Sequence, residues 1–201
     1  MAIFDVMYSR ILNLPLKQTS SLFLFGPRGT GKTSYIRSHL PNALYLDLLE
    51  TELYTKLLGH PGYLEKLIPP NFKDWVVIDE VQKIPELLNE VHRLIESKHL
   101  RFLLTGSSAR TLKRAGVNLL AGRALRHTMH PLTPQELDSD FKLEQAILYG
   151  LLPMTFSSDN PASYLKNYVQ TYLKEEVQQE SIVRNLSSFS RFLEVASFSQ
   201  G

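Results

Sequence analysis

Cysteine is absent from this chain of 201 residues. Its absence excludes disulfide scaffolds, thiolate metal sites and cysteine nucleophiles, and it fits a reducing compartment. The sequence also lacks an apolar run long enough to cross a membrane. A signal peptide is not indicated, because Asp5 and Arg10 interrupt the first apolar residues and no small-residue cleavage site follows. We therefore expect a cytoplasmic protein without a membrane partner.

A strong net charge is missing as well, since the formal net charge is only +2, but the charges are unevenly distributed. Residues 97–130 contain seven Lys and Arg residues and no acidic residue, whereas residues 133–180 contain eight acidic residues and three Lys residues. A basic stretch of this length favours an anionic partner. Nucleotide phosphate, nucleic acid and the acidic stretch itself are the three candidates.

Short apolar runs alternate with helical patterns over the first two thirds of the chain. This alternation predicts an α/β fold with a mostly parallel, five-stranded sheet covered on both faces. Strands are expected at residues 21–25, 43–49, 75–78, 101–105 and within 124–130. Helices are expected at residues 33–40, 50–67 with a break at 59–62, 85–96 and near 108–115.

Both flanks of this core are predicted to be helical. At the N-terminus, Ile3, Met7, Ile11 and Leu14 have helical spacing, which predicts an amphipathic helix. Beyond Pro131 strand patterns cease, and helices are expected at residues 133–137, 142–149 and 161–183, with a last helix running into a turn near the end of the chain. The expected units are an N-terminal helix (1–20), a core (21–135) and a helical region (136–201) that is incomplete at residue 201.

A glycine-rich loop between the first strand and the first helix of the core predicts a phosphate site. The pattern is Gly-x-x-x-x-Gly-Lys-Thr, and we call residues Gly26–Thr33 the glycine loop. Glycines let successive N–H groups point at a phosphate, and the following helix offers its positive end. The Lys32 ammonium would reach the β- and γ-phosphates, and the Thr33 hydroxyl would bind Mg²⁺. The predicted nucleotide-binding residues are Gly26, Pro27, Arg28, Gly29, Thr30, Gly31, Lys32, Thr33 and Ser34.

Two carboxylates end the third strand, where open α/β sheets bind their ligands. Asp79 would hold Mg²⁺ together with Thr33, and Glu80 would orient and deprotonate the attacking water. A glutamate directly after the aspartate favours a hydrolase, because a kinase must keep water away. A GTPase is disfavoured, because no Asn-Lys-x-Asp tetrapeptide occurs. An ordinary acidic turn is the alternative.

Further candidates lie at the end of the fourth strand and just before the fifth. The hydroxyl groups of Thr105 and Ser107 could contact the γ-phosphate or the attacking water, or they could cap the next helix. Arg123 could reach the γ-phosphate in a neighbouring subunit and stabilise the transition state, or it could be a surface arginine paired with an acid. The six histidines show no metal-ligand spacing.

Several stretches together resemble AAA+-type P-loop ATPases, and more narrowly the prokaryotic ATPases that join an AAA core to a C-terminal domain of unknown function. These stretches are LFGPRGTGKT, WVVIDEVQKIPELLNEVHRLIE, RFLLTGSSARTLKRAGVNLLAGRA and HPLTPQEL in the core, and YGLLPM and YLKNYVQTYLKEEVQQESIVRN in the appended region. The resemblance implies a P-loop NTPase three-layer sandwich whose fourth strand lies between the Walker A and Walker B strands. It also implies ATP, Mg²⁺ and assembly into a homo-oligomer.

Three functions are consistent with these observations. The first is a Mg²⁺-dependent ATPase whose cycle moves the C-terminal region. The second is a nucleotide-gated binding or signalling module with little turnover. The third is a DNA-binding regulator that uses the basic stretch, although that stretch lacks the interleaved aromatic residues typical of nucleic-acid surfaces. The target of the ATPase cycle, whether protein or nucleic acid, is not specified by the sequence.

Overall fold

The computed structural model describes residues 8–110, 112, 120, 122–172 and 185–199. Its centre is a five-stranded sheet in the order β2-β3-β4-β1-β5, and every neighbouring pair of strands is parallel. The strands are β1 (Ser21–Phe25), β2 (Leu44–Asp47), β3 (Trp75–Asp79), β4 (Arg101–Gly106) and β5 (Ala124–Thr128). The predicted α/β class is confirmed, and β4 lies between β1 and β3, as the resemblance implies.

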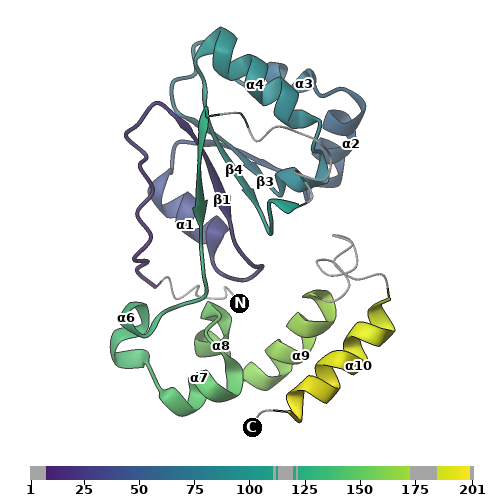
Figure 1. The fold of residues 1–201 in the computed structure, drawn as a ribbon. Helices are drawn as coiled ribbons and strands as arrows, with labels where there is room; N and C mark the ends of the chain where they lie inside the picture. The colour runs from purple at the N-terminus through teal and green to yellow at the C-terminus, as the bar shows by residue number, and fades with distance from the viewer. Residues whose placement is uncertain (1–7, 111, 113–119, 121, 173–184, 200–201) are drawn as a thin grey trace.

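Helices cover both faces of the sheet, as Figure 1 shows. They are α1 (Lys32–His39), α2 (Thr51–Gly59), α3 (Tyr63–Leu67) and α4 (Leu87–Lys98), with a short 3₁₀ turn, η1 (Val81–Lys83), after β3. The predicted break between α2 and α3 is confirmed, and α4 begins two residues after Pro85. The helix expected near residues 108–115 lies mostly outside the described residues.

The core forms two apolar layers because side chains alternate across each strand. On β1, Leu22 and Leu24 pack with Tyr35 and Ile36 of α1 on one face. Phe23 and Phe25 point to the other face, which α2, α3 and α4 cover with buried leucines. Burial on both faces explains why the central strands have continuous apolar runs rather than alternating ones.

The predicted N-terminal helix is wrong for the part of it that the structure describes, since residues 8–20 form no helix. Leu12, Leu14 and Leu16 alternate with polar residues or proline, and they pack with the layer that contains α1. The hydroxyl of Tyr35 donates to the carbonyl oxygen of Leu12 at 2.9 Å, which satisfies backbone that a helix would have paired. Pro15 also disfavours a helix at this point.

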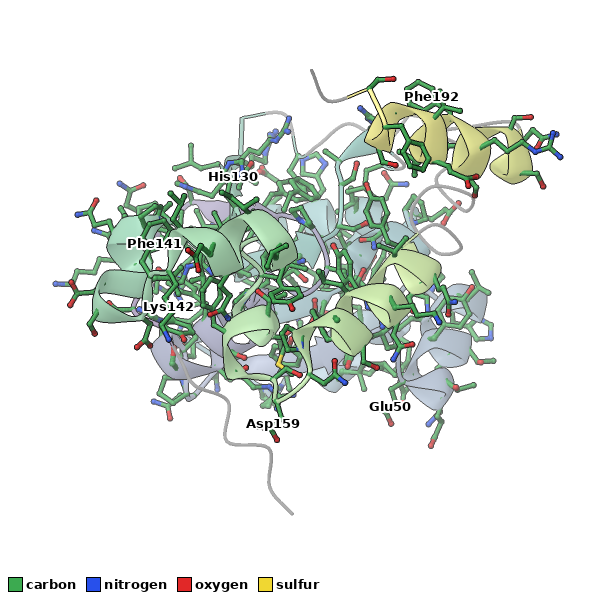
Figure 2. The ribbon with its side chains drawn as sticks, turned by 90° about the horizontal axis from the view of Figure 1, so that it is seen from below. Glu50, His130, Phe141, Lys142, Asp159 and Phe192 are labelled. Atoms are coloured by element: carbon green, nitrogen blue, oxygen red, sulfur yellow. The ribbon has the colours of Figure 1, made fainter. Side chains whose placement is uncertain are left out.

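The C-terminal region lies beyond the carboxyl ends of the strands and is helical, as predicted (Figure 1). Its elements are α6 (Pro134–Leu137), the 3₁₀ turn η2 (Asp138–Asp140), α7 (Leu143–Tyr149), α8 (Pro153–Ser157), α9 (Pro161–Tyr172) and α10 (Leu186–Ser197). The sequence did not predict α8, and the part of the third predicted helix beyond Tyr172 lies outside the described residues. Figure 2 shows α10 at the margin of the molecule, where Phe192 is 62% exposed. No helix in the described part of the chain is long and apolar enough to cross a membrane.

Candidate functional site

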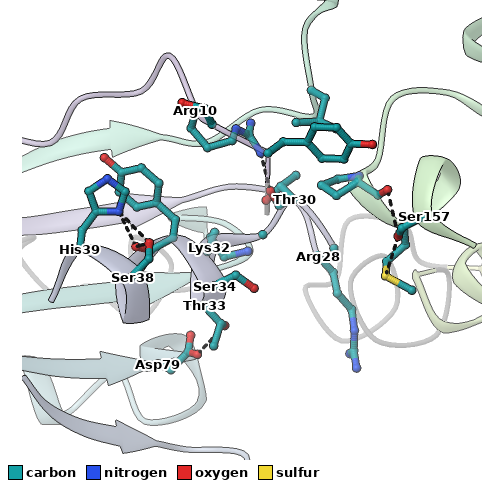
Figure 3. Close-up of a pocket in the computed structure, with 18 of the residues that line it drawn as sticks. Arg10, Arg28, Thr30, Lys32, Thr33, Ser34, Ser38, His39, Asp79 and Ser157 are labelled. Atoms are coloured by element: carbon teal, nitrogen blue, oxygen red, sulfur yellow. Dashed lines mark hydrogen bonds between the residues drawn. The ribbon is translucent and has the colours of Figure 1, made fainter. Parts of the chain in front are cut away.

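A cavity of about 580 Å³ opens at the carboxyl end of the sheet. The glycine loop and the first turn of α1 form its floor, and the ends of β2 and β3 supply Asp47, Asp79 and Glu80. The opposite wall comes from residues 8–10 and from α8, as Figure 3 shows for Arg10 and Ser157. A volume of this size is within the range of small-molecule sites.

The glycine loop has the backbone that its sequence predicts. Gly29 and Gly31 have φ angles of 78° and 90°, in the left-handed region that favours glycine. A Cβ atom on Gly26 would lie 2.2 Å from the carbonyl oxygen of Met129, so that position has no room for a side chain. Gly31 caps α1 without a side-chain hydrogen bond. The first turn of α1 therefore points its N–H groups and the helix's positive end towards the cavity, where an anion can bind.

Lys32 is folded into the glycine loop, and its side chain lies in the cavity shown in Figure 3. Its ammonium group donates to the carbonyl oxygens of Gly26 at 2.6 Å and Pro27 at 3.1 Å. The residue is only 7% exposed, so water screens its charge weakly and the charge interacts strongly with groups in the loop. The loop thus combines backbone donors with one buried positive charge, which suits a phosphate chain.

Asp79 is the centre of a hydrogen-bonded cluster at the end of β3, and only 6% of it is exposed. Its Oδ2 atom accepts from the hydroxyl of Thr33 at 3.1 Å and from the phenol of Tyr45. Its Oδ1 atom accepts from the hydroxyl of Thr105 and from the N–H of Glu80 at 3.1 Å. The predicted pair of Mg²⁺ ligands, Thr33 and Asp79, is therefore brought together.

Tyr45 is a site residue that sequence reasoning missed. It lies on β2, which pairs in parallel with β3, and it therefore reaches the carboxylate two positions beyond its own partner, Val77. Burial and the hydrogen bond to Asp79 both raise the pKa of the Tyr45 phenol well above its usual range, which keeps it a donor. The sequence carried no signal for this contact, because it requires knowing that β2 and β3 are neighbours.

Glu80 follows Asp79 in a left-handed backbone conformation, with a φ angle of 58°. This conformation turns the chain into η1, and the Glu80 carboxylate lines the cavity. Burial raises the pKa of Glu80, and the neighbouring Asp79 raises it further, while the hydrogen bond from Gln82 and the charge of Lys32 lower it. A raised pKa makes a carboxylate a better base near neutral pH.

The structure places the remaining predicted residues in different ways. Thr105 is fully buried and donates to Asp79, so it lies beneath the cavity rather than in its lining. Arg123 lies beside Ser21, at the start of β1 and thus at the opposite end of the sheet, where it pairs with Glu96. Within its own chain, Arg123 is therefore not brought to the site. Ser107 follows β4 and is not part of the cavity lining.

The basic stretch is occupied by contacts within the chain at several points. Lys98 forms an ion pair with Glu65 at 2.5 Å, and the guanidinium of Arg101 lies 5.0 Å from the ring centroid of Trp75. The Arg126 guanidinium lies 5.7 Å from the ring centroid of Phe25. Lys113 and Arg114 lie outside the described residues.

A model of the AAA domain family matches residues 18–137, which is more than half of the chain. The chain belongs to the AAA domain family. The match runs from just before β1 to the end of α6, so it includes the glycine loop and the end of β3. This AAA domain carries the fold of the nucleotide-binding AAA+ P-loop ATPases, as the sequence predicts. No curated protein matches the chain in sequence.

The solved structures similar to this chain include three that have low sequence identity to it. One is the Orc1 protein of Aeropyrum pernix in complex with DNA, at 15% identity and a TM-score of 0.47, covering 88% of this chain and 59% of that chain. AMPPCP-bound DnaA from Aquifex aeolicus has 13% identity and a TM-score of 0.43, covering 81% and 61%. The Drosophila ORC bound to DNA has 16% identity and a TM-score of 0.41, covering 83% and 52%. The chain thus spans less than two thirds of the length of each.

Proposed function

We propose that this AAA domain binds ATP with Mg²⁺ in the cavity above the glycine loop and hydrolyses it. The observation that carries the proposal is the arrangement of Thr33, Asp79 and Glu80 in one cavity with the buried Lys32. The loop and the N-terminus of α1 would bind the phosphates through backbone N–H groups. The rest of the cavity, towards Leu132 and α8, has room for a nucleoside.

The residues present fit Mg²⁺ better than a transition metal. Thr33 and Asp79 offer hard oxygen donors whose nearest atoms are 3.1 Å apart. Among the described residues, no group of three or more His, Asp or Glu side chains could hold a metal on its own. Mg²⁺ at a nucleotide typically takes one or two protein ligands and completes its shell with phosphate oxygens and water. Bound there, it would neutralise charge on the β- and γ-phosphates.

Hydrolysis in this site requires a positioned water molecule and a base. Glu80 would accept a proton from water as the water oxygen attacks the γ-phosphorus, and the bond from that phosphorus to the bridging oxygen would break, giving ADP and phosphate. Lys32 would stabilise the negative charge that develops on the phosphate oxygens. Thr105 would act through Asp79, whose orientation it fixes, and not by touching the γ-phosphate.

The cycle would be coupled to the C-terminal region through the cavity wall. Pro153, Met154 and Ser157 of α8 line the cavity, and Tyr164 of α9 packs so close to Gly29 that a Cβ atom there would lie 3.0 Å from its hydroxyl. A change in the conformation of the glycine loop on phosphate release would therefore alter the contacts of α8 and α9. A role for Arg123 would require a homo-oligomer, in which it would act on the site of a neighbouring subunit.

The proposal predicts the behaviour of Glu80→Gln. Phosphate release from ATP and from GTP is measured with Mg²⁺ on the wild type and on Glu80→Gln. The matched control is Glu86→Gln, which changes an exposed glutamate directly before α4. We expect ATP turnover in the wild type and in Glu86→Gln. Turnover should fall about a hundredfold or more in Glu80→Gln, because general-base catalysis contributes on the order of 10² to 10⁴. ATP binding should remain. Equal rates in all three proteins would remove Glu80 from the mechanism.

A nucleotide-gated module with little turnover is the second candidate, and one contact favours it. The amide of Gln82 donates to the Glu80 carboxylate, and this bond occupies an oxygen that would otherwise be free to accept a proton from water. If the wild type binds ATP tightly without releasing phosphate and Gln82→Ala restores release, the Gln82 contact suppresses turnover and the nucleotide acts as a switch. DNA as a target is not favoured by any described contact, since Lys98, Arg101 and Arg123 already contact their own chain.

A further inference from the structure

The side chain of Arg10 joins three segments that meet beside the cavity. Its Nε atom donates to Glu136 on α6 at 3.0 Å, and its Nη1 atom donates to the carbonyl oxygen of Thr30 in the glycine loop at 2.7 Å. Its Nη2 atom donates to the carbonyl oxygen of His130, in the connection from β5 to α6. Figure 3 shows Arg10 above the loop, with its bond to Thr30.

The guanidinium is held in place by a carboxylate that is itself fixed. The side chains of Arg10 and Glu136 are only 8% and 4% exposed. The Glu136 carboxylate also accepts the N–H groups of Ile11 at 2.8 Å and Thr133 at 2.9 Å, the latter as part of the capping box of α6. A buried ion pair of this kind seldom stabilises a protein more than well-packed apolar side chains of the same volume would. Its geometric precision is what an apolar replacement could not supply.

The bond to Thr30 has a consequence for the loop because a trans peptide is rigid. The described part of the chain has no cis peptide bond, so the carbonyl of Thr30 and the N–H of Gly31 point in opposite directions. Holding the carbonyl towards Arg10 therefore directs the Gly31 N–H to the other side of the peptide. Without that bond the peptide could turn over at little cost, since glycine at position 31 tolerates both signs of φ.

We propose that Arg10 is a positioning residue for phosphate binding, which fixes the Thr30–Gly31 peptide so that the Gly31 N–H is presented to the phosphates. The same side chain ties this peptide to α6 through Glu136, so the conformation of the loop and the position of the C-terminal helices depend on each other. The inference rests on the proposed binding of ATP and adds a residue that lies outside the glycine loop and the end of β3.

The test compares the affinities for ATP and for adenosine, because adenosine lacks the phosphates that the peptide would bind. Affinities are measured for the wild type, Arg10→Gln and Arg10→Lys, at a temperature where circular dichroism shows each to be folded. We expect Arg10→Gln to weaken ATP binding about tenfold or more, the effect of losing one charge-assisted hydrogen bond, and to change adenosine binding by less than about twofold. Arg10→Lys keeps the positive charge but loses the planar guanidinium with its several fixed donors. It should therefore also weaken ATP binding while leaving adenosine binding nearly unchanged.

Two controls separate this role from a general structural one. Glu136→Gln leaves the Arg10 donor to Thr30 in place and should weaken ATP binding less than Arg10→Gln does. Arg93→Gln removes an exposed arginine that pairs with Glu65 and Glu90 on the far side of the sheet, and it should change neither affinity. If Arg10→Gln does not fold, Arg10→Lys decides by the same ratio of affinities.

The outcomes distinguish a failure of the positioning role of Arg10 from a failure of the proposed ATP binding. Equal ATP affinity in wild type and Arg10→Gln, or an equal loss of ATP and adenosine binding, would overturn the positioning role and leave ATP binding intact. A wild type that binds no ATP would overturn the proposed function and the role of Arg10 with it. Selective loss of ATP binding in both Arg10 variants, with Arg93→Gln unchanged, supports the role.

Discussion

At the scale of single residues, the site is organised around Asp79 rather than around the glycine loop alone. Hydroxyl groups of Thr33, Tyr45 and Thr105 come from α1, β2 and β4 and all donate to the one carboxylate. Charge-assisted hydrogen bonds of this kind fix the orientation of an acceptor. The carboxylate is therefore held in one orientation, as the proposed Mg²⁺ site requires, in a geometry that no single element defines.

Tyr45→Phe tests this arrangement. The change removes one donor to Asp79 and keeps the ring, whose centroid lies 5.0 Å from the Arg37 guanidinium. We expect a higher Mg²⁺ concentration for half-maximal ATP turnover, and a loss of stability of about 2 kcal/mol, typical of a hydrogen bond to a charged group. Tyr54→Phe on α2, a tyrosine that packs beside the core and away from Asp79, is the matched control. An unchanged Mg²⁺ requirement in Tyr45→Phe would show that Thr33 and Thr105 suffice.

At the scale of elements, the sequence predicts the strands of the sheet, but it does not predict how the N-terminal segment packs against the core. Strands buried on both faces leave apolar runs bounded by turn residues, and the runs before the glycine loop and before Asp79 could be located to within a residue. Residues 8–20 form no helix, although the apolar spacing predicts one, because two periods compete there. Ile11 and Leu14 continue a helical spacing, whereas Leu12, Leu14 and Leu16 repeat every second residue, and only packing decides between them.

The candidate site was predictable to a similar degree. Loop and strand-end residues such as Lys32 and Asp79 carry a sequence pattern that reflects their chemistry. Tyr45 and Arg10 carry none, since their roles depend on sheet order and on the return of α6 to the glycine loop. The five-residue helix α8, which forms part of the cavity wall, is too short to give a periodic signal.

The contact between the N-terminal segment and α6 predicts how stability depends on pH. Burial alone would raise the pKa of Glu136, but the N–H groups of Ile11 and Thr133 and the Arg10 guanidinium outweigh it, so the pKa lies below its ordinary value. A lowered pKa in the folded state contributes stability that is present above the unfolded pKa of about 4.3 and is lost as the pH falls through the folded pKa.

Urea unfolding of Glu136→Gln and of the wild type between pH 7 and pH 3 measures this contribution. At pH 7 the variant should be less stable by about 3 kcal/mol, the usual cost of breaking a buried ion pair, and the difference should shrink below pH 4.3. Glu52→Gln, which breaks the exposed pair with Lys56 on α2, should show a far smaller difference. A gap between wild type and Glu136→Gln that stays constant with pH would contradict the role of the ionised carboxylate.

At the scale of the whole molecule, the cavity lies between the AAA core and the C-terminal helices, and both contribute to its walls. The glycine loop contacts α9 through Gly29 and Tyr164, it contacts α6 through Arg10, and α8 closes the far side. A ligand in the cavity would therefore touch the core and the C-terminal region at once. The proposed nucleotide-driven movement requires such an arrangement, whether the proposed turnover is fast or slow.

The central claim is that this cavity holds ATP, and a titration tests it most directly. Binding of ATP with Mg²⁺ is measured by calorimetry on the wild type and on Lys32→Ala, with circular dichroism to show that both are folded. We predict one ATP per chain for the wild type and no detectable binding for Lys32→Ala, because that ammonium is the buried positive charge of the glycine loop, whereas Arg28 is exposed. Equal affinity for ATP in the two folded proteins would contradict the assignment of the site.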